Sequence, residues 1–287
     1  MKRTLILLCA LVAGAVLALP AAAITDGELD GDGHPYVGLM VAQDGDGNHL
    51  WRCSGTLMSP TVFLTAGHCT EAPAEHIEIW FDAGPILNDP DYVSVAAGGT
   101  GCANPLVDGY PCDGDVGGTP YTHPDYDPNA FFLHDLGVVV LDGGGITMST
   151  YGVLPQPGQL DALKTQRGKQ DVTFTAVGYG LQKSFPDAAS WKTQADRVRM
   201  VSHPKLIQIN NGYVGDFSIL LSNNAHTGGT RFGDSGGPNF IGDSNVVGSV
   251  TSFGKNGNCA GTGGVYRVDQ PDDLAWLATF GLYPPAA

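Results

Sequence analysis

Three short segments of the sequence carry the residue types that acyl transfer through a serine requires. They are TAGHC around His68, HDLGVVVL around Asp135 and GDSGGP around Ser235. A serine hydroxyl is a poor nucleophile at neutral pH unless an imidazole accepts its proton and a buried carboxylate orients that imidazole. Each segment offers one of these groups beside an apolar, strand-like run. Ser235 is thus a candidate nucleophile, His68 a candidate base and Asp135 a candidate for the orienting group. Taken separately, His68 could equally be a satisfied structural histidine, Asp135 a strand-end cap and Ser235 a turn residue in a glycine-rich loop.

Other histidines and one acidic run offer competing chemistry. His134 stands beside Asp135, but it would point across the strand from it. The run QDGDGNH at 43–49 departs from the calcium-loop pattern, because the glycine that the pattern requires after its acidic positions and the terminal glutamate are both missing. We therefore interpret it as a polar turn. We expect no metal and no cofactor. Structural or surface positions are expected for His34, His49, His76, His123, His134, His203 and His226.

The elements that position these groups are predicted to be short strands joined by turns. The chain contains 41 glycines and 19 prolines, while helical periodicity is scarce. One helix is expected near the end, where Leu274, Leu277 and Ala278 share a face behind Asp272 as a candidate N-cap. Apolar, β-branched runs recur at 35–42, 61–67, 136–141, 171–180, 217–222 and 245–252.

The N-terminus has the features of an export signal. A basic start at 2–3 precedes an apolar run over 5–19, and the alanines before Ile24 fit a small-residue cleavage site. The run is shorter than the roughly 20 residues of a membrane-spanning helix. We predict a signal peptide over 1–23 and a secreted, monomeric mature chain over 24–287. The net charge of −15 argues against nucleic-acid binding and against membrane association after signal removal.

Five cysteines remain after signal removal, and exported proteins are where disulfides persist. Cys53 and Cys69 close a loop of the size for which chain entropy predicts about 3 kcal/mol of stabilisation. Cys102 and Cys112 can close a local loop rich in glycine and proline. Cys259 is then odd, which leaves a buried free thiol, a different pairing or an intermolecular link.

The three segments occur in the order His, Asp, Ser, and with their flanks they resemble the trypsin-like serine proteases of the chymotrypsin fold. CSGTLMSPTVFLTAGHC is similar to the family segment in which a cysteine after the histidine bonds one on an earlier strand, which implies the pair Cys53–Cys69. THPDYDP, TAVGYG and GGVYRV are similar to three further stretches of the family. The resemblance covers most of residues 24–280, and it implies protein or peptide substrates.

The resemblance implies an all-β fold of two six-stranded antiparallel barrels of the chymotrypsin type, with a short C-terminal helix and the active site in the cleft between the barrels. We assign the protease domain to 24–287. Within it we expect the first barrel at about 24–141, a linker at about 142–159, the second barrel at about 160–270 and the helix at about 272–281.

Further roles follow from the resemblance. The backbone N–H groups of Gly233 and Ser235 would hold the oxyanion of the tetrahedral intermediate. Ser252 matches the serine that hydrogen-bonds the buried aspartate and lines the specificity pocket. Thr251 is an alternative, because this segment aligns with one extra residue.

The same resemblance implies an open, uncharged specificity pocket. Its base would be Gly229, where an aspartate would select Arg or Lys, and Thr230 would narrow that base slightly. Gly254 and Gly264 match the two wall positions where glycine leaves the pocket open. We expect a preference for an apolar or aromatic residue before the scissile bond, because burying such a side chain contributes about 1.5–3 kcal/mol.

The chain departs from the family pattern in two places near this pocket. Arg231 stands where the family has a cysteine bonded to the residue that aligns with Cys259, so the walls could shift, or Arg231 could reach the rim and favour an acidic residue. The spacing from His68 to Asp135 is also longer than usual. We expect the insertion to hold the Cys102–Cys112 loop and to border the cleft.

The N-terminus created at Ile24 has an implied role of its own. In the family a freed N-terminal ammonium folds inward and pairs with the aspartate before the nucleophile, here Asp234. Signal removal and activation would then be one event. The alternative function is a catalytically silent homologue that acts as a secreted binding module. An α/β-hydrolase is excluded because GDSGGP is not its GxSxG elbow and the triad order differs.

Overall fold

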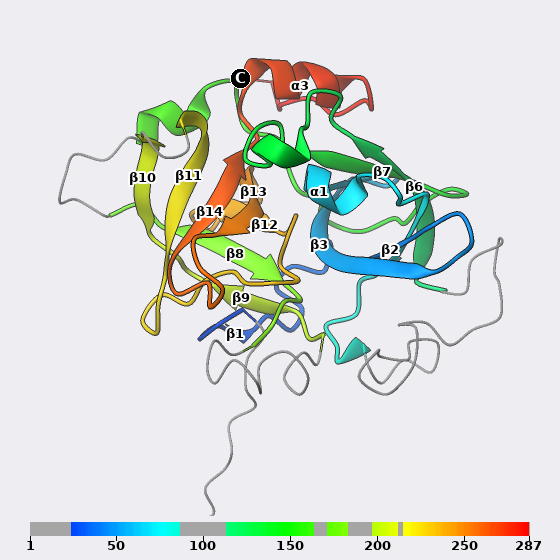
Figure 1. Ribbon diagram of the computed structural model, residues 1–287, viewed down its shortest axis with the longest axis horizontal. Coiled ribbons are helices and arrows are strands. Elements are labelled where there is room, and N and C mark those ends of the chain that lie inside the picture. The colour runs from blue at the N-terminus through cyan, green and yellow to red at the C-terminus, as the bar shows by residue number, and fades with distance from the viewer. Residues whose placement is uncertain (1–23, 87–112, 164–170, 183–196, 212–214, 287) are drawn as a thin grey trace, which may run out of the picture.

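The first half of the protein is a closed barrel of antiparallel strands (Figure 1). The structure is a computed structural model that describes residues 24–86, 113–163, 171–182, 197–211 and 215–286. The strands in barrel order are β2 (Val37–Gln43), β3 (His49–Ser59), β4 (Val62–Thr65), β7 (Gly137–Leu141), β6 (Val116–Thr122) and β5 (His76–Trp80).

Strand β2 is buried on both faces, which shows how the barrel is attached to the rest of the protein. Successive side chains of a strand point to opposite sides. Met40 and Ala42 therefore pack in the main core of the barrel, whereas Leu39 and Val41 pack in a separate cluster that includes Tyr179 of the second half. The barrel and the second half thus share an apolar interface.

The second half is a curled sheet of eight strands (Figure 1). Strands β9 and β10 belong to one bent segment, and an isolated bridge between Thr173 and Lys205 continues the pairing across the bend. The all-β prediction is confirmed, but the predicted second six-stranded barrel is here an eight-stranded sheet, because that segment counts as two strands and β1 adds an edge. The order is β1 (Glu28–Leu29), β9 (Met200–Ser202), β8 (Phe174–Gly178), β12 (Pro238–Ile241), β13 (Val247–Gly254), β14 (Gly261–Arg267), β11 (Gly215–Asn223) and β10 (Leu206–Asn211).

The N-terminal segment belongs with the second sheet, although the sequence assigned it to the first barrel. Strand β1 pairs antiparallel with β9. The segment is anchored by Arg199, whose Nε donates to Oδ2 of Asp30 at 2.9 Å and whose Nη1 donates to the carbonyl oxygen of Phe81 at 2.8 Å. Both charged side chains are 1% exposed. A buried ion pair therefore ties the segment around β1 to both halves.

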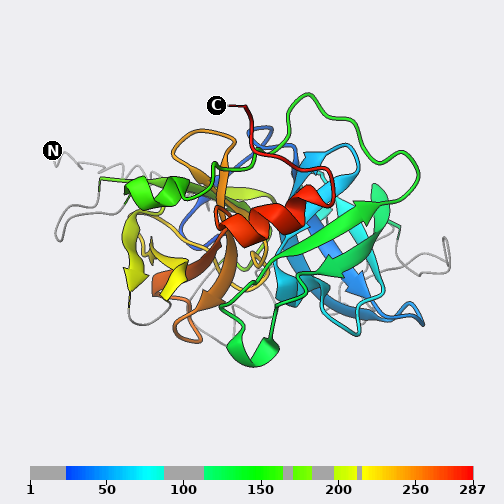
Figure 2. The same ribbon diagram turned by 90° about the horizontal axis from the view of Figure 1, so that it is seen from above.

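The C-terminal helix α3 (Pro271–Ala278) lies across the junction of the two halves, as Figure 2 shows from above. Its buried Leu274 and Leu277 face the core as predicted. The predicted N-cap is wrong. The N-cap is Gln270, because proline is suited to the first helical position and Pro271 starts the helix two residues before an N-cap at Asp272 would. Asp272 lies instead in the first turn. Among the described residues, two named 3-10 turns are η3 (Pro128–Ala130) and η4 (Gln159–Leu163).

Candidate active site

His68 is carried by α1 (Gly67–Thr70), a single helical turn that follows β4. A disulfide joins Cys69 of this turn to Cys53 on β3, with 6.2 Å between their α-carbons, which confirms the predicted pair. Trp51 Nε1 donates to the carbonyl oxygen of Cys69 at 2.9 Å. So short a helix cannot hold itself in place, and the disulfide and this hydrogen bond fix it on the barrel. The predicted Cys102–Cys112 pair lies outside the described residues.

Asp135 precedes β7 and faces the imidazole of His68. Its side chain is fully buried, and His68 Nδ1 lies 3.0 Å from Oδ2 and 3.1 Å from Oδ1. The backbone N–H of His68 also donates to Oδ1 at 2.9 Å. An ionised carboxylate only accepts hydrogen bonds, so Nδ1 carries the proton and Nε2 keeps its lone pair. This tautomer is the one that a general base requires.

A serine of the second half completes the environment of Asp135. Ser252 Oγ donates to Oδ2 of Asp135 at 2.6 Å. The alternative, Thr251, instead accepts from Asn239 Nδ2 at 3.2 Å. Burial alone would lower the pKa of His68, but the facing carboxylate of Asp135 outweighs it and holds that pKa above its ordinary value of 6.5.

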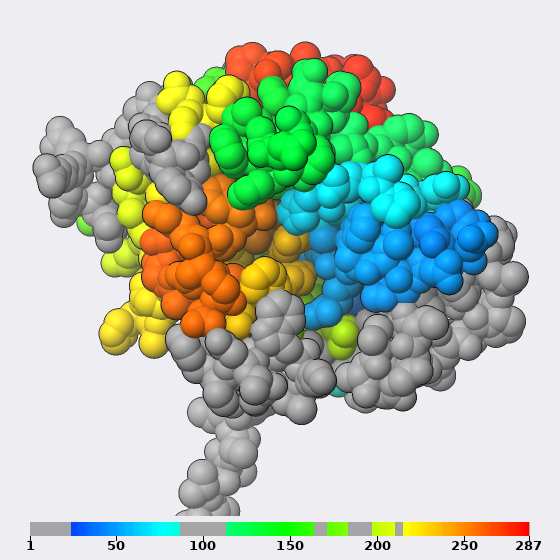
Figure 3. All heavy atoms as spheres, in the orientation of Figure 1, coloured from blue at the N-terminus to red at the C-terminus, as the bar shows by residue number. Residues whose placement is uncertain are grey.

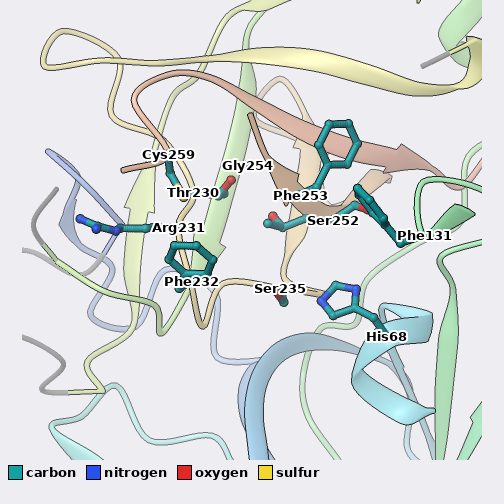
Figure 4. A pocket seen from close by; sticks show the side chains of 11 residues that line it. His68, Phe131, Thr230, Arg231, Phe232, Ser235, Ser252, Phe253, Gly254 and Cys259 are labelled. Carbon is teal, nitrogen blue, oxygen red and sulfur yellow. The ribbon is translucent and has the colours of Figure 1, made fainter. Parts of the chain in front are cut away.

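Ser235 lies beside His68, and both residues line two adjoining cavities (Figure 4). On the face shown in Figure 3 the two halves meet, with cyan and blue from the barrel and gold and orange from the sheet. The first cavity, about 410 Å³ in volume, is named the aromatic cavity after Phe131, Phe232 and Phe253 in its walls. The second, about 370 Å³, is named the Arg52 groove and is lined by residues 49–53, Leu181, Phe232 and Gly233, besides His68 and Ser235.

The loop before Ser235 is set up to present backbone N–H groups. The carbonyl oxygen of Phe232 accepts from the N–H of Leu181 at 2.9 Å, and the carbonyl oxygen of Asp234 accepts from the N–H of Gly237 at 2.8 Å. In a trans peptide the N–H points away from the carbonyl. The N–H groups of Gly233 and Ser235 are thereby turned the other way, and neither has a hydrogen-bond partner among the described residues. Gly233 has a φ of 94°, which favours glycine.

Ser54 of β3 holds this loop in place, and the sequence reasoning did not identify it. Its Oγ donates to the carbonyl oxygen of Gly233 at 2.9 Å and accepts from the N–H of Tyr179 at 3.0 Å. Its own N–H donates to the carbonyl oxygen of Ser235 at 2.8 Å. A serine next to a cysteine of a predicted disulfide is the only local signal, because every partner of Ser54 lies far along the chain.

The structure places only part of the predicted specificity pocket in the aromatic cavity. Thr230, Ser252 and Gly254 line it. Gly229 and Gly264 are not among its lining residues. A Cβ on Gly229 would lie 2.3 Å from Cγ of Asn223, and one on Gly264 would lie 2.2 Å from Cζ of Phe253. These two glycines therefore make room for neighbouring side chains, and aromatic rings that the sequence did not single out form the walls.

The structure decides between the alternatives that the sequence left open for Arg231 and Cys259. Arg231 is 3% exposed and points away from Ser235 in Figure 4, so it does not reach the rim of the cavity. Cys259 is free and buried, as the first of the three alternatives had it, and its sulfur would lie 2.9 Å from a Cβ on Gly254. Burial raises the pKa of this thiol.

Ile24 and Asp234 are both fully buried, and Asp234 belongs to the loop before Ser235. Thr25, next to Ile24, forms a bridge with Gly229. The Asp234 carboxylate accepts from the N–H of Gly180 at 2.7 Å and from the N–H of Arg231 at 2.8 Å, and burial raises its pKa to about 7. In the uncut chain the Ile24 nitrogen belongs to a peptide bond, so an ion pair between Ile24 and Asp234 requires cleavage.

Within the described residues, two groups of side chains bring three potential metal ligands close together. Cys53, His68 and Cys69 lie close together, but both sulfurs are used by the disulfide. His123, His134 and Asp273 also gather within 4.8 Å. There the N–H of Asp125 donates to His123 Nδ1 at 3.2 Å, so Nε2 carries the ring proton and faces Asp273. A metal on that nitrogen would have to displace this proton, so the group does not fit a metal site.

Comparisons with known proteins identify the family. A family model described as trypsin matches residues 30–272. The chain belongs to the trypsin family. Ovochymase of Halocynthia roretzi is 24% identical over 228 residues, which cover 76% of this chain and 12% of ovochymase. Phenoloxidase-activating enzyme of Bombyx mori is 35% identical over 98 residues, which cover 31% of this chain and 20% of that enzyme. The chain thus matches a minor part of both relatives.

Solved structures agree with the fold of the trypsin family. A structure described as HL collagenase superposes with a TM-score of 0.60 at 18% identity, covering 90% of this chain and 98% of the collagenase. At this identity the likeness concerns the fold alone. Among the described residues, no helix combines the length and apolar character needed to cross a membrane.

Proposed function

We propose that this trypsin-family chain is a secreted serine endopeptidase that cleaves protein or peptide substrates through an acyl-enzyme. The observation that supports this best is His68, held on the buried carboxylate of Asp135 and lining the same two cavities as Ser235. Each of these residues comes from a separate segment, so a purely structural origin would have to explain why the imidazole held by Asp135 lines the same cavities as Ser235.

The proposed reaction has two stages. Ser235 Oγ attacks the scissile carbonyl carbon while Nε2 of His68 takes the hydroxyl proton, and His68 then delivers that proton to the leaving amine. Water, activated by His68, hydrolyses the acyl-enzyme. The N–H groups of Gly233 and Ser235 stabilise the oxyanion, and the loss of one donor in such a site costs about 2.7–4 kcal/mol. Asp135 stabilises the imidazolium.

The aromatic cavity supports a preference for an apolar or aromatic residue before the scissile bond. Its lining carries three phenylalanines and no aspartate or glutamate among the described residues. The cationic residue Arg231 is also in the lining, but its side chain points away from Ser235 (Figure 4). We assign the preference to this cavity as a whole, with Thr230, Ser252 and Gly254 in its wall and Gly229 and Gly264 behind it.

We further propose that removal of residues 1–23 activates the domain 24–287. Ile24 is already buried, and burial raises the pKa of Asp234 to about 7. A new ammonium at Ile24 would pair with this carboxylate. One extra residue before Ile24 should sharply reduce kcat/KM, and full activity with that residue would contradict the coupling.

Labelling with a fluorophosphonate tests the function directly. The folded mature protein should bind one equivalent at Ser235, located by mass spectrometry, whereas the unfolded protein and the Ser235→Ala variant should not react. The other candidate is a catalytically silent binding module. Absence of labelling in a correctly processed, folded sample would contradict the proposed protease activity and favour the binding module.

A further inference from the structure

The Arg52 groove adjoins Ser235 and is lined largely by other residues than the aromatic cavity. The two cavities share His68, Phe232 and Ser235, and they differ in all their other lining residues. A peptide bound across Ser235 must therefore place residues in both. This inference rests on the proposed function, in which the aromatic cavity takes the side chain before the scissile bond. The Arg52 groove then receives the residues that follow the scissile bond.

Arg52 lies next to the loop that would hold the oxyanion. A Cβ built on Gly233 would be 3.3 Å from Nη2 and 3.4 Å from Nε of Arg52. The backbone of Arg52 is fixed opposite Val41 in the β2–β3 ladder. Its neighbour Trp51 is pinned to α1 by the bond from its indole N–H to the carbonyl oxygen of Cys69. The guanidinium is thus attached to a rigid strand beside the scissile bond.

The charge of the groove contrasts with that of the protein. The chain has a formal net charge of −15, yet no aspartate or glutamate is among the described residues that line the groove. Burial, with the nearby charges of Arg52 and Arg197, lowers the pKa of His49 to about 4. His49 is therefore neutral at neutral pH, whereas Arg52 is the cationic residue among the described residues that line the groove.

We propose that Arg52 is a specificity determinant that selects substrates with an aspartate or glutamate at one of the two positions after the scissile bond. A guanidinium offers a fork of N–H donors that matches a carboxylate, and such charge-assisted hydrogen bonds are stronger than neutral ones. Together with the aromatic cavity, this defines a substrate with an apolar residue before the cut and an acidic residue after it.

The test begins with the unmodified mature protein. Cut sites in a denatured protein mixture are mapped by mass spectrometry, and one efficiently cut peptide is then remade with Asp, Asn or Lys at each of the two following positions. We expect kcat/KM for the best Asp peptide to exceed that of its Asn counterpart roughly tenfold. The advantage should shrink as NaCl is raised from 0.05 to 0.5 M, because salt screens charge pairs. Equal rates for Asp and Asn peptides would overturn the proposal.

Two variants separate contact with substrate from an effect on the oxyanion loop. Arg52→Gln should remove the Asp advantage while leaving the Asn peptide within about threefold of its original rate. Arg52→Glu should reverse the preference toward the Lys peptide. Lys205→Gln and Lys205→Glu are matched controls, because Lys205 is exposed and does not line the groove. They should keep the original preference.

Each outcome has one meaning. If Arg52→Gln slows the Asp, Asn and Lys peptides equally, Arg52 supports the loop and the selectivity proposal fails. If an Arg52 variant does not fold, as fluorophosphonate labelling would reveal, the Asp-to-Asn ratio and its salt dependence in the unmodified protein decide. Failure of the proposed function itself is different, because then no peptide is cut and Ser235 is not labelled.

Discussion

Two of the centres at which a histidine faces a buried aspartate differ in their surroundings, and the first of these two lies on a cleft. In the first, His68 faces Asp135, which also accepts a hydroxyl hydrogen bond from Ser252 at 2.6 Å. In the second, His134 Nδ1 lies 3.3 Å from Oδ1 of Asp273, which accepts from Tyr266 Oη at 2.7 Å. Both carboxylates are fully buried.

The surroundings of the two centres differ. His68 is 26% exposed and lines two cavities with a serine. The second centre stacks His134 on His123, with ring centroids 4.9 Å apart, and Trp276 of α3 packs edge-on against His123 at 4.8 Å. An imidazole on a carboxylate is therefore insufficient for catalysis. The first centre lies beside a serine hydroxyl and two cavities, whereas the second joins α3 to the barrel.

Replacing the histidine of each centre by alanine should give the largest difference between the two centres. His68→Ala should lower kcat by about 10⁶-fold, because the serine then has no base. His134→Ala should leave kcat within a few-fold and lower the thermal midpoint instead. Peptidase kinetics and thermal unfolding of both variants provide the comparison. A loss of kcat for His134→Ala as large as that for His68→Ala would erase the distinction.

Neutralising each carboxylate gives the next largest contrast. Asp135→Asn should lower kcat by about 10⁴-fold, since an amide no longer enforces the reactive tautomer of His68. Asp273→Asn should change kcat little and reduce the free energy of unfolding by about 1–3 kcal/mol, through imperfect hydrogen bonds in a buried site. The control is Asp272→Asn, because that side chain is 57% exposed and should have no clear effect.

The hydroxyl donors should show the same contrast on a smaller scale. Ser252→Ala should reduce kcat about tenfold, because Asp135 then loses one of the bonds that orient it. Tyr266→Phe should instead cost about 1–2 kcal/mol of stability, measured by urea unfolding, with kcat unchanged. A stability loss without any kinetic change in Ser252→Ala would show that the bond to Asp135 is only structural.

The pH responses of the centres should differ in sign and in readout. Activity needs neutral His68, whose pKa is raised, so kcat/KM should fall as the pH decreases through a midpoint above 6.5, and Asp135→Asn should lower that midpoint. Burial raises the pKa of Asp273 to about 6 from 3.8, so the folded state holds that proton more tightly. The stability that protonated Asp273 contributes should therefore be lost as the pH rises from about 4 to 6. This contribution of Asp273 is measured by comparing the thermal unfolding of Ser235→Ala with that of the double variant Ser235→Ala, Asp273→Asn across this pH range.

The sequence predicted the all-β class, the Cys53–Cys69 disulfide and the trypsin family, because each rests on local residue patterns. It also singled out Ser252, whose hydrogen bond to Asp135 is present in the structure. The pocket lining was predicted less well. Whether Gly229 and Gly264 open the pocket depends on where Asn223 and Phe253 place their side chains, and these contacts are made across strands.

The motifs around His68, Asp135 and Ser235 determined the chemistry that this protein can offer, since residue type and order alone carry that information. The tertiary structure decided which imidazole lies on a cleft, that Ser54 holds the loop before Ser235, and that Arg52 lies beside Gly233. The physical reason is that burial, cavities and charge are properties of segments packed together, and a linear pattern contains no distances between them.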